Sequence, residues 1–115
     1  MIQLDRLWYQ YAKKEPILQE ISIEFSAGKI YGLLGKNGAG KSTLIKNMTG
    51  MLFPTRGSCK VNGIIPGNRE VDFLKNLFFV PEEYYLPNLS IRQLIKVYPK
   101  FYPKFNSQQF KGYLE

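Results

Sequence analysis

The sequence predicts an α/β fold in which a parallel core carries a phosphate loop and an antiparallel group of strands lies beside it. Residues 1–25 alternate between apolar and polar side chains, as half-buried antiparallel strands do. Residues 30–34 instead form a short apolar run, typical of a strand buried on both faces of a parallel sheet, and a glycine-rich loop follows it. With 115 residues and 44% apolar side chains, the chain is globular and holds one domain at most.

The first elements are two strands joined by a polar turn. Residues 1–11 alternate loosely, and we expect a turn or bulge near Asp5 and Arg6. Residues 18–25 alternate more cleanly and form the second strand. The segment between them is polar and contains a proline, which predicts a turn.

A buried strand, a loop and a helix follow. Residues 29–35 give the strand of the parallel core, and residues 41–49 give a helix with an apolar stripe that Gly50 ends. Next comes a short strand over 58–61, which Asn62-Gly63 closes with a strong hairpin-turn signal.

The last part of the chain reads as a helical turn, a second buried strand and two helices. The turn covers 71–76 and the strand 77–80. Ser90 and Gln93 form a capping box that begins a helix reaching about Tyr98.

Asn106 is expected to cap the final helix, residues 107–114. This helix reaches the last residue without a stop signal, which indicates that residues 1–115 are the first part of a larger domain, with no second domain.

Composition narrows the class of protein. No apolar run is long enough to span a membrane, and the N-terminus lacks a signal-peptide layout, so a cytosolic protein is expected. The net charge of +7 comes from scattered residues without a dense basic arm, so no direct contact with nucleic acid is expected. Cys59 has no cysteine or histidine partner and is expected to be a packed, inert thiol.

One motif carries the chemistry. Eight residues fit the phosphate-loop pattern G-x-x-x-x-G-K-[ST], between a predicted strand and a predicted helix. They are Gly35, Lys36, Asn37, Gly38, Ala39, Gly40, Lys41 and Ser42.

The residue types explain the choice of ligand. Glycines remove Cβ atoms, so backbone N–H groups can surround phosphates, and the start of the following helix adds partial positive charge. Lys41 can reach the β- and γ-phosphates, Ser42 can coordinate Mg²⁺, and Thr43 can donate a further hydrogen bond to the α-phosphate. An ordinary glycine-rich turn that binds nothing is the alternative, but the fixed spacing argues against it.

The loop and its surroundings closely resemble the ATP-binding subunit of ABC transporters, which are P-loop NTPases. The resemblance rests on the loop, on Thr49-Gly50, on Pro54-Thr55-Arg56-Gly57 and on Val61-Asn62-Gly63, and it spans essentially the whole chain. It implies ATP and Mg²⁺ as ligands. It also implies that Tyr11 stacks on the adenine, although Tyr11 could instead be simple strand packing.

The resemblance also assigns Glu82, with one departure. Val80-Pro81-Glu82 matches the family's loop between nucleotide and transmembrane partner, where glutamine is usual. A carboxylate can still bind Mg²⁺, so Glu82 is a candidate metal ligand and catalytic residue together with Lys41, although it would add negative charge beside the γ-phosphate. Proline followed by two acidic residues resembles an exporter branch, in which residues 84–89 would face the membrane subunit.

We therefore expect part of an ATPase that powers transport across a membrane, lying on the cytoplasmic face. Its expected partners are a transmembrane subunit and a second ATP-binding subunit. The chain contains neither a Ser-Gly-Gly-Gln signature nor an apolar strand ending in Asp-Glu, so these 115 residues alone are expected to be inactive.

Three alternatives share the loop. A soluble ABC-type ATPase could act on a nucleic-acid or ribosomal complex, and a truncated fragment could bind nucleotide without activity. A small P-loop kinase is a poorer match outside the loop. The sequence does not reveal the transported substrate or the direction of transport.

Overall fold

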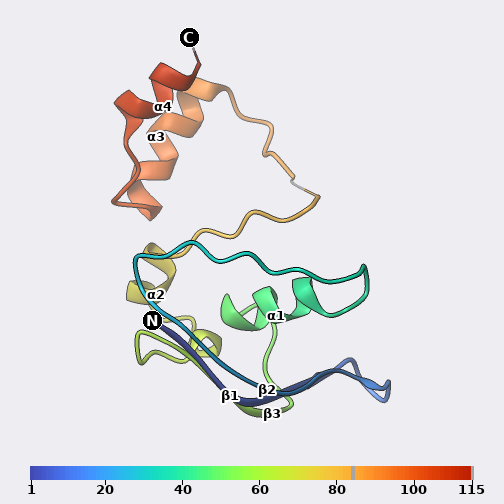
Figure 1. Ribbon diagram of the computed structural model, residues 1–115. Coiled ribbons are helices and arrows are strands. Elements are labelled where there is room, and N and C mark those ends of the chain that lie inside the picture. Colours follow the sequence, from blue (N-terminus) through green and yellow to red (C-terminus); the bar gives the residue numbers. More distant parts are fainter. Residues whose placement is uncertain (84, 115) are drawn as a thin grey trace. The chain divides into compact units, whose positions relative to one another are not determined.

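The computed structural model describes residues 1–83 and 85–114, and it divides into two compact units, Met1–Phe73 and Leu74–Glu115. The first unit contains a three-stranded antiparallel sheet in the order β2-β1-β3 (Figure 1). Its strands are β1 (Ile2–Gln10), β2 (Pro16–Phe25) and β3 (Arg56–Val61). The antiparallel group predicted from alternation is therefore confirmed.

The bulge predicted near Asp5 and Arg6 is present in β1. The register of β1 against both neighbours shifts just after Leu4 and Asp5, and Arg6 has a φ of 44°. A Cβ on Gly57 would lie 2.1 Å from the Arg6 carbonyl oxygen. A glycine is therefore required where β3 passes the bulge.

Helix α1 (Lys41–Met48) packs on this sheet and completes a small core. Five buried side chains make up the core: Leu4, Leu7, Leu18, Leu44 and Cys59. Leu44 is the contribution of the predicted apolar stripe of α1, and Cys59 is buried as the sequence predicts. Burial removes apolar area from water, which stabilises the helix on the sheet.

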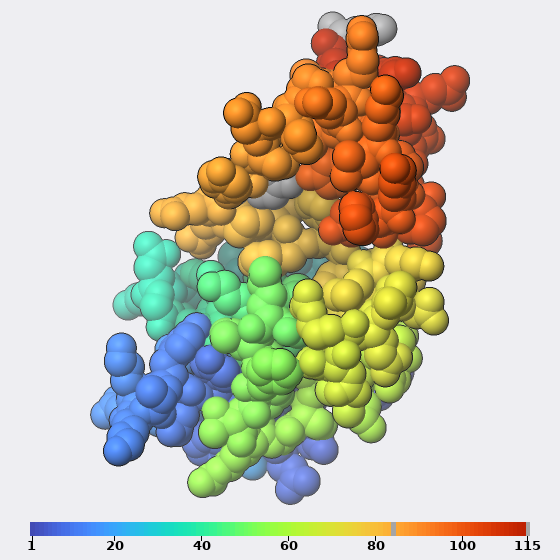
Figure 2. Space-filling model, turned by 180° about the vertical axis from the view of Figure 1, so that it is seen from behind, coloured from blue at the N-terminus to red at the C-terminus, as the bar shows by residue number. Residues whose placement is uncertain are grey.

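A hairpin turn follows β3 as predicted. Asn62 and Gly63 have φ values of 50° and 78°, and Val61 and Ile64 exchange backbone hydrogen bonds of 2.8 and 2.9 Å. A 3₁₀ turn, η1 (Pro66–Asn68), and a short helix, α2 (Val71–Lys75), come next. In the space-filling view the yellow-green segments after β3 pack closely together (Figure 2).

Two predicted strands are wrong in this structure. Residues 29–35 and 77–80 form no strand, and Ile30 and Leu34 are almost completely exposed. A strand buried on both faces depends on neighbouring strands for hydrogen bonds and for apolar cover. Within residues 1–83 and 85–114, no strand pairs with either segment, so both remain irregular.

The second unit contains two helices, α3 (Ile91–Phe101) and α4 (Ser107–Tyr113). Both predicted caps are present: Ser90 and Gln93 form a complete capping box, and the Asn106 side chain accepts a hydrogen bond from the Gln109 N–H. Helix α3 extends past the predicted end near Tyr98 and includes Pro99. No helix in the described part of the chain is both long and apolar enough to cross a membrane.

Candidate functional site

The phosphate loop leads directly into α1. The Ala39 N–H donates to the Lys36 carbonyl at 3.1 Å, which closes a tight turn. Gly38 and Gly40 have φ values of 86° and 96°, a region that side chains with a Cβ rarely adopt. Two of the three loop glycines, Gly38 and Gly40, therefore have the backbone conformation that requires glycine, and Gly35 does not.

Gly40 also brings the loop against the start of β2. A Cβ at this position would lie 2.8 Å from Ile17 Cγ2 and 3.0 Å from Leu18 Cδ2. Leu18 belongs to the buried core, so this contact fixes the end of the loop to the sheet. The start of α1 is therefore positioned next to the core of the first unit.

Lys41 is the first residue of α1, and its ammonium group folds back over the loop. Its Nζ donates to the Gly35 carbonyl oxygen and, at 3.3 Å, to that of Lys36. The ammonium group therefore lies against the carbonyl oxygens of the loop, where it stays accessible to a ligand. Ser42 follows with an exposed side chain, free to meet a ligand.

The start of α1 adds further donors. Leu44 N–H is bonded to the Gly40 carbonyl at 2.8 Å, so the N–H groups of residues 41–43 precede the first intrahelical bond. The first turn of α1 contains no acidic residue. The partial positive charge of the helix start is therefore not neutralised locally, and the site favours an anion.

Tyr11 lies beside the first turn of α1. Its hydroxyl is 3.2 Å from Thr43 Oγ1, where either oxygen could donate, and its ring makes an edge contact with Tyr9 at 4.8 Å between centroids. The structure therefore brings the predicted base-stacking residue to the predicted phosphate-binding helix. Thr43 itself is only 7% exposed, and the hydroxyl predicted to meet the α-phosphate is bonded to Tyr11.

Glu82 belongs to the second unit, where its side chain is exposed in the loop between α2 and α3. Its predicted contact with Mg²⁺ rests on the resemblance alone. Of the segment predicted to face a membrane subunit, residues 84–89, Tyr84 lies outside the described residues.

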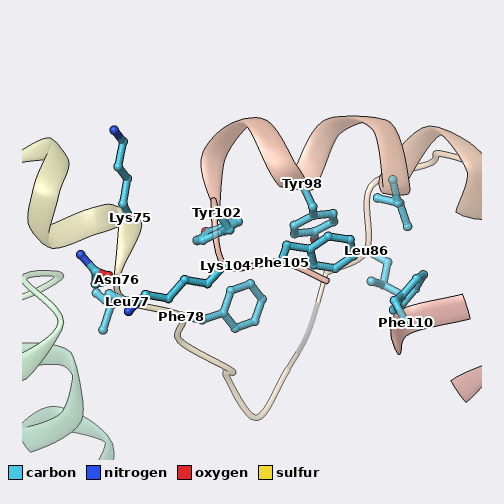
Figure 3. Close-up of a pocket in the computed structure, with 11 residues that line it drawn as sticks. Lys75, Asn76, Leu77, Phe78, Leu86, Tyr98, Tyr102, Lys104, Phe105 and Phe110 are labelled. Carbon is cyan, nitrogen blue, oxygen red and sulfur yellow. The ribbon is translucent and has the colours of Figure 1, made fainter. Parts of the chain in front are cut away.

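The second unit also holds an apolar cavity of about 530 Å³. Aromatic rings from α3, α4 and the chain between them line it, with Lys104 at its edge (Figure 3). Tyr98 and Phe105 stack at 5.9 Å, and Phe78 meets Tyr102 at 5.4 Å. Sequence reasoning missed this cavity, although the aromatic side chains at 98, 102 and 105 were a readable signal.

The residues of the first unit fit a magnesium-bound triphosphate. An uncompensated helix start, a lysine ammonium and an exposed hydroxyl meet around one glycine-rich turn. Backbone N–H groups and a cation suit phosphate oxygens, and a hydroxyl oxygen suits Mg²⁺. The fold and this site define a P-loop nucleotide-binding protein.

Comparison with known proteins identifies the family. The ABC transporter family matches residues 18–111, most of the chain, so this protein belongs to that family. The ATP-binding protein EcfA of an energy-coupling factor transporter, from Methanosarcina acetivorans, is 32% identical over 117 aligned residues, covering 83% of this chain and 43% of EcfA.

Solved structures show the same fold. A structure of the ATP-binding subunit of an ABC transporter matches with a TM-score of 0.80 and 23% identity, covering 96% of this chain and 46% of that one. The cbiO1 protein from Clostridium perfringens, part of an ABC transporter complex cbiONQ, matches with a TM-score of 0.52 and 32% identity, covering 54% and 25%. This chain therefore spans less than half the length of these relatives.

Proposed function

We propose that this chain binds Mg-ATP through its phosphate loop. The position of Lys41 carries the proposal, because its ammonium lies within the loop at the positive end of α1. Lys41 and the N–H groups of the loop and of Gly40 to Thr43 would hold the β- and γ-phosphates. Ser42 would hold Mg²⁺, which when bound offsets the negative charge of the phosphate oxygens.

Tyr11 would hold the adenine. Its ring is half-buried and adjoins the first turn of α1 through Thr43. If Tyr11 donates in that bond, the Thr43 hydroxyl keeps its own proton for the α-phosphate. The two residues would then bind neighbouring parts of one nucleotide.

The larger proposal concerns the complete protein, an ATPase that powers transport. EcfA belongs to a transporter and cbiO1 to a transporter complex, which supports partner subunits for the complete protein. These partners would be a transmembrane subunit and a second ATP-binding subunit, with the protein on the cytoplasmic face of a membrane. Neither relative favours the alternative of an ATPase acting on nucleic acid or ribosomes. Glu82 would bind Mg²⁺ and help to orient the attacking water, and the exporter branch stays a prediction.

The binding proposal is tested by calorimetric titration of Mg-ATP into the chain and into Lys41→Ala. Loss of a charge-assisted contact should weaken binding by about 2 kcal/mol, or roughly 30-fold in Kd. Lys46→Ala is the matched control, since Lys46 lies in the last turn of the same helix. We expect the control to change Kd less than about threefold. Equal affinities for the chain and Lys41→Ala would refute a phosphate contact by Lys41.

A further inference from the structure

Two tyrosines near the end of β1 contact each other, and only one of them has a proposed role. The Tyr9 and Tyr11 rings meet at 4.8 Å with an angle of 83° between their planes, which is an edge-to-face arrangement. Aromatic pairs favour this geometry because the positive edge of one ring meets the negative face of the other. The contact therefore prefers one orientation of the Tyr11 ring.

The two residues differ in how firmly they are held. Tyr9 lies within β1, pairs with Leu18 of β2, and packs against the buried core. Tyr11 lies just after β1, where Lys14 N–H bonds to its carbonyl at 3.0 Å and Ala12 has a φ of 47°. Tyr11 lies outside β1, and the contacts of its side chain are with the ring of Tyr9 and the hydroxyl of Thr43.

Those neighbours act at opposite ends of the Tyr11 side chain. Thr43 bonds its hydroxyl at 3.2 Å, and Tyr9 meets its ring. Burial, and secondarily the nearby Tyr11, raise the pKa of Tyr9 above its ordinary value, so this phenol stays uncharged well past neutral pH, as an ordinary tyrosine also does. A neutral ring supports its partner by packing, without adding charge near a phosphate.

We propose that Tyr9 is a positioning residue of the nucleotide site, which holds the Tyr11 ring in the orientation that stacks on a purine base. This inference rests on the proposed function of Tyr11. A ring already held in its bound orientation loses less freedom when the base arrives, so the contact raises affinity without touching the ligand. Removing Tyr9 should therefore weaken ATP binding and leave binding of the phosphates alone unchanged.

The experiment measures Kd for Mg-ATP and for magnesium tripolyphosphate, which lacks the base. Tyr9→Ile and Tyr9→Leu both remove the ring and keep an apolar side chain for the core, and either one that folds is sufficient. We expect a loss of about three- to tenfold for ATP, and less than about twofold for tripolyphosphate. Tyr9→Phe keeps the ring and should bind both ligands as the unchanged chain does.

Trp8→Leu is the matched control on the same strand, because Trp8 contacts Arg56 instead of Tyr11. It should leave the ratio of the two affinities unchanged. Tyr11→Ala shows whether the base site exists, and its failure to weaken ATP selectively would overturn the proposed function itself. If Tyr11→Ala is selective but the Tyr9 variants weaken both ligands equally, or neither, Tyr9 is only a packing residue.

Discussion

Lys41 binds two carbonyl oxygens of its own loop, those of Gly35 and Lys36. These contacts keep the ammonium at the place where phosphate oxygens would come. A phosphate oxygen carries more negative charge than a carbonyl oxygen, so it makes a stronger hydrogen bond with the same cation. The two carbonyl oxygens therefore position the Lys41 ammonium, and phosphate oxygens of a nucleotide can replace them as its hydrogen-bond acceptors.

The structure also affects the ionisation of the Cys59 thiol. It is 4% exposed in the core of the first unit, and burial raises the pKa of its thiol from 9.0 to about 11. The folded chain therefore keeps this proton at pH values where the unfolded chain loses it. The protonated thiol therefore makes its full contribution to the stability of the folded chain below pH 9, and this contribution is lost as the pH rises to about 11.

This difference is measurable as a pH dependence of unfolding. Between pH 9 and 11, the free energy of unfolding should fall more steeply for the unchanged chain than for Cys59→Ala, by up to about 2 kcal/mol. Urea titrations at several pH values give the two curves. Parallel curves over that range would show that the thiol ionises as easily in the folded chain as in the unfolded one.

At the scale of elements, the junction between the loop and α1 depends on one glycine. Gly40 combines a φ of 96° with contact distances that leave no space for a Cβ. Gly40→Ala should cost about 2 kcal/mol or more of unfolding free energy, because backbone strain and a clash with Ile17 add together.

Gly112→Ala is the control for that substitution. Gly112 lies in the last turn of α4, and apart from the backbone of its own helix nothing is within 4 Å of the position that a Cβ would take there. Alanine at this position should be neutral or stabilise by up to about 1 kcal/mol, because its backbone conformation suits alanine and alanine has less freedom to lose on folding. Urea unfolding followed by circular dichroism measures both variants, and a neutral Gly40→Ala would contradict the close contact with β2.

Local patterns predicted the elements whose signal lies in their own residues. The antiparallel strands, α1, the Asn62-Gly63 turn and both helix caps follow from alternation and from capping residues. The strands predicted over 29–35 and 77–80 are wrong because their apolar runs fit a strand covered on both faces, and no strand among the described residues pairs with them.

The predicted end of α3 near Tyr98 is too early. The helix continues past Pro99, although proline lacks the backbone N–H that a helix interior uses. The rings of Tyr98 and Tyr102 stack at 5.9 Å on either side of Pro99, and this packing helps to hold the last turn. Site residues were predicted from a motif with fixed spacing, whereas the Tyr9–Tyr11–Thr43 contacts join parts of the chain that only the fold brings together.

For the whole molecule, binding and turnover are separate properties. The first unit supplies the loop, Lys41 and Ser42, but the 115 residues contain no Ser-Gly-Gly-Gln signature and no Asp-Glu pair. Binding without stabilisation of the transition state does not accelerate hydrolysis. The isolated chain should therefore release no phosphate above background in excess Mg-ATP.

Steady-state phosphate release measures this, and Lys41→Ala reveals any contaminating ATPase. A turnover of about 1 per second or faster lies in the usual enzyme range. If the chain reached such a rate and Lys41→Ala abolished the activity, the chain would be a complete catalyst. A companion variant, Glu82→Gln, should then change the rate only if Glu82 acts on the γ-phosphate.

The most direct test of nucleotide binding at the phosphate loop is a two-dimensional ¹H–¹⁵N spectrum of the chain during titration with Mg-ATP. Amide signals of the loop and of the start of α1, residues 35–43, should shift together with Tyr11 and should saturate at one equivalent. Lys41→Ala should lose most of these shifts at the same concentrations. Shifts confined to residues 74–114, or no shifts at all, would contradict the proposed site.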